Sequence, residues 1–357
     1  MTTAVHIVPS LPPPLEGVGT YALRLADALR ARSGINSAFL VASPVWTPDP
    51  KDPENIPEMA GRRALPLAAP TPEALRSALA ALAEPGERPL ALLHYAGYGY
   101  HPRGCPDWLI EALEGWNGRL VTAFHEVWAS GPPWRSSFWL SPRQQRLAGR
   151  LARRSDGLVT SLDTYRRLLL RAAPGREAVV MPVFSTVGEP EPVPPLQGRS
   201  PCLVLFGGPG ARSRAYRHLG TTIARACEAL ALEEIWDLGP PIPEPPERIA
   251  GRPVRRLGPL PAAVVSRTLL AAVAGFVSYP APLLAKSTIF AAYCSHGMLP
   301  VSAWPWPRRR VEPPPPFWRL AAASSEDPQE VADRGRAWYS RHSLDRCAEL
   351  YGRLLLA

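Results

Sequence analysis

The chain has 357 residues, 46% of them hydrophobic and 20% charged, which favours two globular domains, each with its own core. Its formal net charge of +9 suits nucleotide, phosphate or anionic-membrane partners, but the arginines are scattered, which argues against a nucleic-acid-binding arm. Five cysteines without a CxxC pair argue against a disulfide framework, and no apolar run reaches the ~20 residues that cross a bilayer. Since the start lacks a signal-peptide pattern, we expect a cytoplasmic protein, with peripheral contact to an anionic membrane as a further expectation.

The first half of the chain alternates short apolar runs with segments of helical periodicity, which is typical of a parallel α/β sheet. The expected strands are 4–8, 36–43, 89–94, 119–124, 157–161 and 179–184. The expected helices are 22–31, 71–83, 106–114, 142–154 and 162–171, with a proline-rich, acidic surface excursion at 47–62.

Two places in this half have the features of ligand sites. Gly17 and Gly19 precede the first helix, where small residues let the backbone approach a phosphate or a sugar, although a tight turn is the alternative. His125 and Glu126 directly follow an expected strand, which is a favoured ligand position, although a histidine satisfied within the fold is the alternative.

A second α/β series follows the proline-rich segment 185–200, which has no periodicity and is the best linker in the chain. Its expected strands are 202–206, 234–238, 253–257, 274–278 and a last one that ends at 301; its expected helices are 216–230, 262–271, 328–339 and 344–356. The stretch 304–316 is expected to be a loop. We therefore predict an N-terminal domain at 1–184, a linker at 185–200, a C-terminal domain at 201–335 and a closing helical segment at 336–357, which would pack back on the N-terminal domain.

The stretch 284–301, LAKSTIFAAYCSHGMLPV, predicts a short loop, a helix, a turn at 296–297 and a buried strand. Lys286 and Ser287 would lie at the helix N-terminus, where free N–H groups and a partial positive charge attract anions. The chain has only two lysines, Lys51 and Lys286, so a lysine at this place is notable. A solvated lysine at a helix end is the alternative.

The order and spacing of these pieces resemble the retaining glycosyltransferase family four, over nearly the whole chain. The resemblance rests on VPSLPPPLEGVGTYALRLADAL at the start, FHE at 124–126, VLFGGPGARSRAYR at 204–217, GPLPAAVVSRTLLAAVAGFVSYP at 258–280 and LAKSTIFAAYCSHGMLPV at 284–301. It implies a GT-B fold, with two Rossmann-like parallel-sheet domains that face a cleft and C-terminal helices that close the junction.

The resemblance also implies roles for residues of the first domain. Gly17 and Gly19 would offer backbone donors to the donor diphosphate and the anomeric centre. His125 would touch the donor sugar, and Glu126 is the best carboxylate for a base or an acceptor contact.

In the second domain, the resemblance implies the nucleotide-sugar site. Arg212 and Arg214 correspond to the family's basic pair, Gly258 and Leu260 to the loop that frames the base, and the segment 286–288 (Lys286, Ser287 and Thr288) to the diphosphate loop. Because the sequence contains no DxD pair, Arg212, Arg214 and Lys286 would neutralise the leaving diphosphate in place of a metal.

One departure from the family is serious. Its two glutamates fall here on Leu284 and Ala292, or on Ala285 and Tyr293 if the alignment is anchored on the strand that follows. The first glutamate normally holds the sugar and the second the ribose. This chain therefore uses other groups, binds a different donor or has lost activity.

The favoured hypothesis is a metal-independent, retaining glycosyltransferase without a cofactor, which uses a nucleotide sugar as donor and a glycan, a lipid or a small molecule as acceptor. A GT-B-like protein that binds a nucleotide sugar or a glycan without turnover is the main alternative. A basic nucleic-acid-binding protein ranks lower, because no recognition helix, zinc site or RNA-binding signature accompanies the charge. The GGPG sequence at 207–210 does not fit the GxGxxG spacing of a nicotinamide dehydrogenase.

Overall fold

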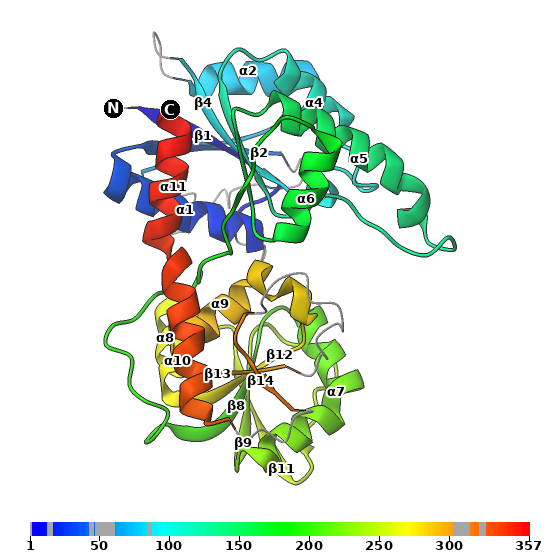
Figure 1. Cartoon of the computed structure of the whole chain (residues 1–357). Helices are drawn as coiled ribbons and strands as arrows, with labels where there is room; N and C mark the ends of the chain where they lie inside the picture. Colours follow the sequence, from blue (N-terminus) through cyan, green and yellow to red (C-terminus); the bar gives the residue numbers. More distant parts are fainter. Residues whose placement is uncertain are drawn as a thin grey trace. The chain divides into compact units, whose positions relative to one another are not determined.

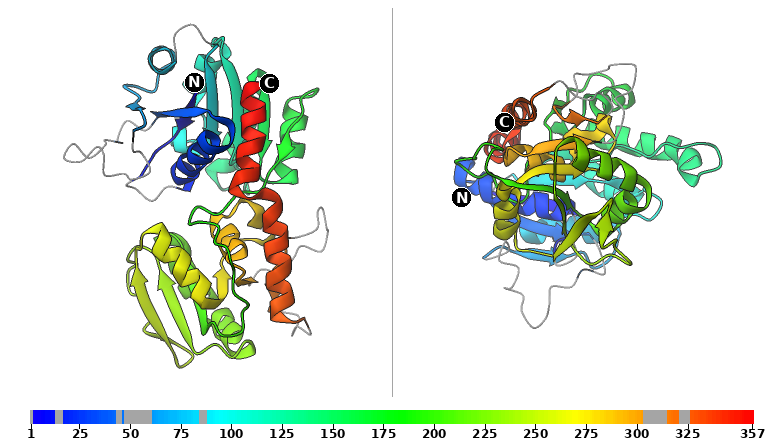
Figure 2. Two further views of the ribbon diagram at one scale, coloured as in Figure 1. Left: turned by 90° about the vertical axis from the view of Figure 1, so that its left-hand side faces the viewer. Right: turned by 90° about the horizontal axis from the view of Figure 1, so that it is seen from below.

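The computed structural model describes residues 2–12, 17–42, 46, 61–83, 88–302, 315–320 and 326–357, and these form two compact units (Figures 1 and 2). Unit 1 comprises Met1–Pro182 with Leu344–Ala357, and unit 2 comprises Val183–Ser343. Most of the excursion expected at 47–62, including Lys51, and most of the loop expected at 304–316 lie outside the described residues.

In its described part, unit 1 has a seven-stranded sheet in the order β3-β2-β1-β4-β5-β6-β7, with parallel pairing throughout. The strands are β1 Thr3–Val8, β2 Asn36–Val41, β3 Ala64–Pro66, β4 Leu90–Tyr95, β5 Arg119–Phe124, β6 Gly157–Thr160 and β7 Val179–Val180. The central strands are mostly apolar on both faces because helices cover the sheet on both sides. The strand order reverses between β1 and β4, and sheets of this kind bind ligands beyond the carboxyl ends of their strands at such a point.

Two groups of helices cover this sheet (Figure 1). The helices are α1 Gly17–Ser33, α2 Pro72–Leu82, α3 Gly97–Tyr100, α4 Asp107–Glu114, α5 Ser136–Arg154, α6 Asp163–Ala172 and α11 Leu344–Leu356. Helices α2, α4, α5 and α6 pack in succession and share one hydrophobic core with the sheet. Helix α11 packs against α1 at Gly352, where a Cβ atom would lie 2.3 Å from Oγ of Ser33, so a larger residue would require the Ser33 side chain to move.

The described residues of unit 2 form a sheet in the order β10-β11-β9-β8-β12-β13-β14, which is parallel except for β10 with β11. The strands are β8 Ser200–Phe206, β9 Glu234–Leu238, β10 Arg248–Ile249, β11 Arg252–Gly258, β12 Ala272–Val277, β13 Leu299–Ser302 and β14 Trp318–Arg319. The helices are α7 Pro209–Ala229, α8 Ala262–Ala271, η2 Ala281–Lys286, α9 Thr288–Ser295, α10 Pro328–Tyr339 and η3 Ser340–His342. The strand order reverses between β8 and β12, as it does between β1 and β4 in unit 1.

Three helices begin earlier than we predicted. Helix α1 begins at Gly17 instead of residue 22, α5 at Ser136 instead of 142, and α7 at Pro209 instead of 216. Proline at the first helical position costs no hydrogen bond, so the glycine-proline segment before α7 is compatible with a helix start. Conversely, Pro142 lies inside α5, where proline is disfavoured, which explains why the sequence pattern suggested a helix start there. The segment that follows the strand expected at 89–94 contains the short helix α3, and of the strand expected at 179–184 only β7 is present.

Candidate functional site

The first group of predicted site residues lies at the carboxyl ends of β1 and β5 in unit 1. We predicted that Gly17 and Gly19 precede the first helix, but both lie in the first turn of α1. At Gly19 a Cβ atom would lie 2.4 Å from the carbonyl oxygen of Ser10, so glycine is required for the helix to approach this connection. Gly17 has no such neighbour. The first four N–H groups of a helix have no intrahelical acceptor, so this turn can offer donors to an anion.

His125 and Glu126 directly follow β5, and the backbone holds them beside β4. The N–H groups of His125 and Glu126 both donate to the carbonyl oxygen of Tyr95, at 3.0 and 3.4 Å. The side chain of His125 is half-buried and that of Glu126 is exposed. The strand-end pairing therefore fixes the backbone of both residues while it leaves the Glu126 carboxylate accessible.

The ring of His125 is one end of a row of hydrogen-bonded side chains. Its Nε2 lies 3.2 Å from Nδ1 of His94, Nε2 of His94 lies 3.1 Å from Nδ1 of His6, and Nε2 of His6 lies 3.1 Å from Oγ of Ser37. The rings of His6 and His94 are fully buried and stack at 5.3 Å, and those of His94 and His125 stack at 5.5 Å. The ring of Tyr21 on α1 meets His125 edge-on at 5.0 Å. His125 is therefore held on two sides.

Burial keeps the two inner histidines neutral. It lowers the pKa of His6 from 6.5 to about 3, and the positive charge of Arg62 contributes to this shift. Burial also lowers the pKa of His94 well below its usual value, with smaller contributions from His6 and His125. At neutral pH each of the two inner rings therefore carries one N–H group.

In unit 2, the loops after β8, β9 and β11 lie against one another at the carboxyl end of the sheet. The N–H of Gly207 donates to the carbonyl of Leu238 at 3.1 Å, and that of Gly239 donates to the carbonyl of Gly258 at 3.0 Å. Gly207, Gly239 and Gly258 have φ values of +134°, +142° and +72°, a region that favours glycine. A Cβ atom on Gly207 would lie 2.5 Å from Cδ1 of Ile289 in α9, so the first loop also reaches the start of that helix. Four segments thus meet at one edge, and three of them, all but the loop after β9, contain predicted site residues.

Arg212 and Arg214 lie on α7 and have different environments. The guanidinium of Arg212 is 4% exposed and forms an ion pair with Asp237, which is 3% exposed. It also donates to the carbonyls of Gly207, at 2.9 Å, and Pro240. The side chain of Arg214 is exposed and forms no hydrogen bond or ion pair with any other described residue. Arg212 therefore holds the glycine loops in place, whereas Arg214 offers its charge to solvent.

Lys286, Ser287 and Thr288 lie at the start of α9, as we predicted. Lys286 ends η2, Ser287 is the N-cap and Thr288 is the first residue of α9. The Ser287 hydroxyl accepts from the N–H of Phe290 at 3.2 Å, so it satisfies one of the helix's unpaired donors. Lys286 and Thr288 are both half-buried. Leu260 is also half-buried and lies two residues after Gly258.

The positions that would carry the family's two glutamates are occupied by apolar or satisfied side chains. Leu284 and Ala292 are buried among hydrophobic residues. Tyr293 is fully buried, and its hydroxyl donates to the carbonyl of Val204 at 3.1 Å and accepts from the N–H of Phe206 at 3.2 Å. None of these positions has a carboxylate to offer a sugar.

The sequence reasoning missed the residues that support this site. His6, Ser37 and His94 were predicted only as members of apolar strands. Asp237, the partner of Arg212, is a carboxylate inside the strand EIWDL, between the apolar residues Trp236 and Leu238. A polar side chain inside an otherwise apolar run is a usable signal, because such a group must find a buried partner.

Among the described residues, no cluster of three or more His, Cys, Asp or Glu side chains is arranged to hold a metal ion. No helix in the described ranges has the length and apolarity of a membrane span.

No protein-family model and no curated protein matches the sequence. Among solved structures, the GtfA/B complex matches with a TM-score of 0.64 at 10% identity, over 100% of this chain and 99% of that one. UDP-GlcNAc 2-epimerase from Neisseria meningitidis, bound to UDP-GlcNAc, matches with a TM-score of 0.57 at 11% identity, over 100% of both chains. An alpha-glucosyltransferase in complex with UDP-glucose and DNA containing an abasic site matches with a TM-score of 0.51 at 11% identity, over 100% and 95%.

At such low identity these matches establish the fold alone. In each unit, the first six parallel strands follow the order 3-2-1-4-5-6 when they are numbered along the chain, with the antiparallel β10 of unit 2 left out. Together with this strand order, the matches confirm the predicted GT-B fold class. The fold is shared by proteins whose names denote transfer and epimerisation, so function must be argued from the site.

Proposed function

We propose that this chain is a glycosyltransferase that moves a sugar from a nucleoside-diphosphate donor to an acceptor, without a metal ion or other cofactor and with retention at the anomeric carbon. The observation that carries the proposal is the meeting of the loops after β8, β9 and β11 with the start of α9 in unit 2. In an open α/β sheet this edge is where nucleotides bind. Retention is what the resemblance to family four implies.

The donor half of the reaction belongs to unit 2. Departure of the nucleoside diphosphate requires stabilisation of its growing negative charge, which fixed cations and N–H dipoles provide without a metal. Lys286 and the N-terminus of α9 would supply this charge, with Arg214 as the second cation. Arg212 would shape the loops from within, and Gly258 and Leu260 would frame the base.

Unit 1 would supply the sugar and acceptor contacts. The first turn of α1, with Gly17 and Gly19, would offer N–H donors to the donor, and His125 would contact its sugar. Glu126 is the exposed carboxylate of this group and would contact the acceptor hydroxyl or take its proton.

A second function is favoured by one observation. Leu284 and Ala292 are buried and apolar where the family carries its carboxylates, so the protein would bind a nucleotide sugar without turning it over. Nucleotide binding is common to both functions, and only turnover separates them.

Calorimetric titration of the purified chain with UDP, GDP and ADP in the presence of EDTA tests the donor site. We expect saturable binding of one nucleotide, reduced at least tenfold by Lys286→Ala and several-fold by Arg214→Ala. Arg217→Ala is the matched control, because Arg217 is exposed on the same helix and should leave binding unchanged. Absence of binding by all three nucleotides would refute the donor-site assignment.

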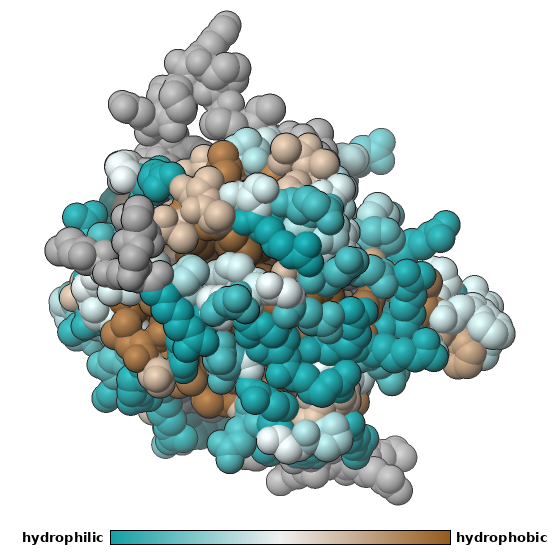
Figure 3. Space-filling model, turned by 90° about the horizontal axis from the view of Figure 1, so that it is seen from above, coloured by the Kyte–Doolittle hydropathy of each residue, from teal (hydrophilic) through white to brown (hydrophobic). Residues whose placement is uncertain are grey.

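The acceptor side has a surface suited to anionic lipid. Trp134, Phe138 and Trp139, which we call the α5 tip, are 83%, 42% and 72% exposed. The tip projects from unit 1 in Figure 1 and is pale to brown at the right of Figure 3. Arg135 and Arg146 are exposed beside it, and their guanidinium groups form no hydrogen bond or ion pair within the described part of the chain. Exposed tryptophans with adjacent cations suit the interface of an anionic membrane.

We therefore propose that the α5 tip rests on an anionic membrane and brings unit 1 to an acceptor there. Cosedimentation with phosphatidylglycerol-containing vesicles should be lost in Trp134→Ser/Trp139→Ser and weakened in Arg135→Gln/Arg146→Gln. Arg217→Gln/Arg225→Gln, on α7, is the charge-matched control and should sediment like the wild type. Equal binding of all variants, or binding of DNA instead of vesicles through this tip, would refute the membrane contact.

A further inference from the structure

Four neighbouring strands place Ser37, His6, His94 and His125 on a diagonal across one face of the sheet of unit 1. Ser37 on β2 is level with Ala4 on β1, two residues before His6. His6 is level with Leu92 on β4, two residues before His94, and His94 is level with Ala123 on β5, two residues before His125. Each step moves one strand across and two residues along. Because side chains alternate faces in a strand, all four point to the same side.

The position of the proton on each ring of this row depends on the position of the proton on its neighbour. Each inner histidine uses both ring nitrogens, and a neutral ring has one donor and one acceptor nitrogen. Only two arrangements satisfy every bond: all donors point towards His125, or all point towards Ser37. In the first, Nε2 of His125 accepts from His94 and the proton of His125 is on Nδ1. In the second, Nε2 of His125 carries the proton.

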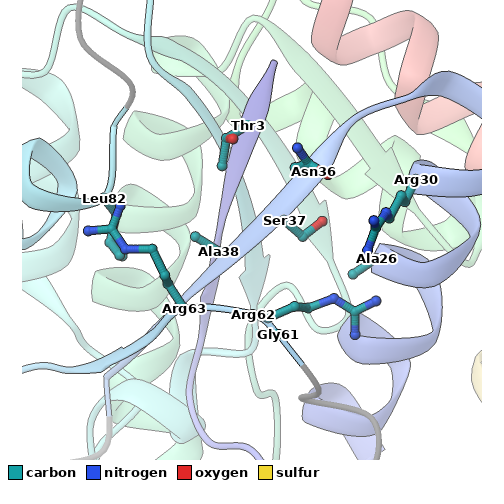
Figure 4. Close-up of a pocket in the computed structure, with 10 residues that line it drawn as sticks. All are labelled: Thr3, Ala26, Arg30, Asn36, Ser37, Ala38, Gly61, Arg62, Arg63 and Leu82. Carbon is teal, nitrogen blue, oxygen red and sulfur yellow. The ribbon is translucent and has the colours of Figure 1, made fainter. Parts of the chain in front are cut away.

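Positive charge at the Ser37 end distinguishes the two arrangements. Ser37 lines a cavity of about 240 Å³. Arg30 and Arg62 line the same cavity, and Figure 4 shows both side chains on the same side of the cavity as Ser37. Arg62 pairs with Asp27, whose carboxylate is exposed, and it still acts on His6 as a positive charge. A cation is most stable next to the negative end of a row of dipoles. When all donors point towards His125, the negative end of the row is the Ser37 oxygen, next to the arginines. The positive charge therefore favours the first arrangement.

We propose that Ser37, His6 and His94 are positioning residues that hold His125 in the tautomer with its proton on Nδ1. Ser37 donates to Nε2 of His6, Nδ1 of His6 donates to Nε2 of His94, and Nδ1 of His94 donates to Nε2 of His125. His125 then has an N–H donor on Nδ1, and its ring cannot flip without breaking the row. The inference rests on the proposed function only where it places a sugar oxygen beside that donor.

Long-range ¹H–¹⁵N correlation spectra of the full chain labelled with ¹⁵N-histidine test this inference at neutral pH. Protonated and unprotonated ring nitrogens differ strongly in ¹⁵N shift, and the His125 signals are assigned by their loss in His125→Gln. We expect His125 to show a protonated Nδ1 and an unprotonated Nε2. A protonated Nε2 on His125 in the wild type would overturn the proposal without any further variant.

Two variants test the coupling through the row. In His94→Leu nothing donates to Nε2 of His125, so the proton should shift to Nε2, which an imidazole ring in water prefers. In Ser37→Ala the anchoring donor is lost while all rings remain, and both tautomers should be populated. Ser266→Ala is the matched control, because the Ser266 hydroxyl bonds to Nε2 of the buried His296 in unit 2 at 2.8 Å and should not affect His125.

An unchanged His125 tautomer in Ser37→Ala and His94→Leu would also overturn the proposal. Because the spectra are recorded without ligand, they are independent of glycosyl transfer. If the tautomer responds as expected but no nucleotide binds, the histidine row stands and the proposed function fails. If nucleotide binds but the tautomer does not respond, the proposed function stands and the row has no positioning role.

Discussion

The ion pair of Arg212 with Asp237 shows how single residues shape the donor loops. Both side chains are almost completely buried, and the remaining guanidinium donors reach the carbonyls of Gly207 and Pro240. One arginine thus joins the loop after β8 to the loop after β9. Replacing both partners of such a buried pair by apolar residues changes the folding stability little. Removing only one partner is costly, because the other charge then stays buried without a partner.

Arg212→Ala should therefore destabilise unit 2 by about 3–5 kcal/mol, because Asp237 would remain buried and charged. Native-state hydrogen exchange of the amides in β8 and β9 measures this loss. Arg214→Ala is the control and should leave protection unchanged, since Arg214 is exposed. Equal protection in both variants would show that the buried pair does not hold the loops.

Sequence reasoning predicted Lys286, Ser287 and Thr288 at a helix start but could not separate the roles of Arg212 and Arg214. The helix start is local: an apolar period begins directly after a serine that can cap it. Asp237, the partner of Arg212, lies 25 residues away on strand β9, and His94, one of the two partners of His6, lies 88 residues away. Such pairs depend on sheet order and register, which sequence periodicity does not contain.

At the scale of elements, the first turn of α1 is fixed by its close approach to the connection after β1. Gly19→Ala should destabilise unit 1 by about 1–3 kcal/mol, because its Cβ would meet the Ser10 carbonyl oxygen and force the helix to shift. Gly17→Ala, in the same turn, has open space and should be neutral or slightly stabilising. Urea unfolding followed by hydrogen exchange in β1 compares the two, and equal effects would contradict the packing argument.

The central strands and most helices followed from apolar runs and helical periodicity, while several boundaries did not. Strands β1, β5 and β9 and helices α8 and α10 lie within one residue of their predicted bounds. The starts of α1, α5 and α7 were missed because glycine, serine and proline in a first turn resemble a loop in sequence. Only contacts to other elements show that these turns are helical.

At the scale of the whole molecule, buried neutral histidines make the free energy of unfolding depend on pH. Burial lowers the pKa of His6 to about 3, of His296 to about 4 and of His342 to about 3. The unfolded chain takes up protons at these sites below pH 6.5, whereas the folded chain does so only near pH 3–4. The stabilisation that these neutral histidines contribute is therefore fully present above pH 6.5, and it is lost as the pH falls from 6.5 towards 3–4.

Between pH 6.5 and 5, where carboxylates are still ionised, each of these groups should lower the unfolding free energy by up to about 1.4 kcal/mol per pH unit. Urea unfolding at several pH values measures the slope. His296→Gln should reduce the slope in unit 2 while leaving that of unit 1 unchanged. A stability that does not change over this range would contradict neutral burial of these histidines.

The whole molecule has the GT-B fold, and both units place their predicted site residues at the carboxyl ends of parallel strands. The fold does not decide turnover. The family that the sequence resembles has two glutamates, and their places fall here on Leu284 and Ala292, or on Ala285 and Tyr293, none of which has a carboxylate. We propose that Lys286, Arg214 and helix dipoles suffice to stabilise the departing diphosphate.

The most direct test of this central claim is the release of nucleoside diphosphate from UDP-, GDP- and ADP-sugars by the purified chain in EDTA. We expect nucleoside diphosphate to be released from one donor without metal. The rate of release should fall at least tenfold in Lys286→Ala and stay unchanged in Arg217→Ala. Saturable binding of that donor with no release, with or without candidate acceptors, would contradict the proposed transferase and support binding without turnover.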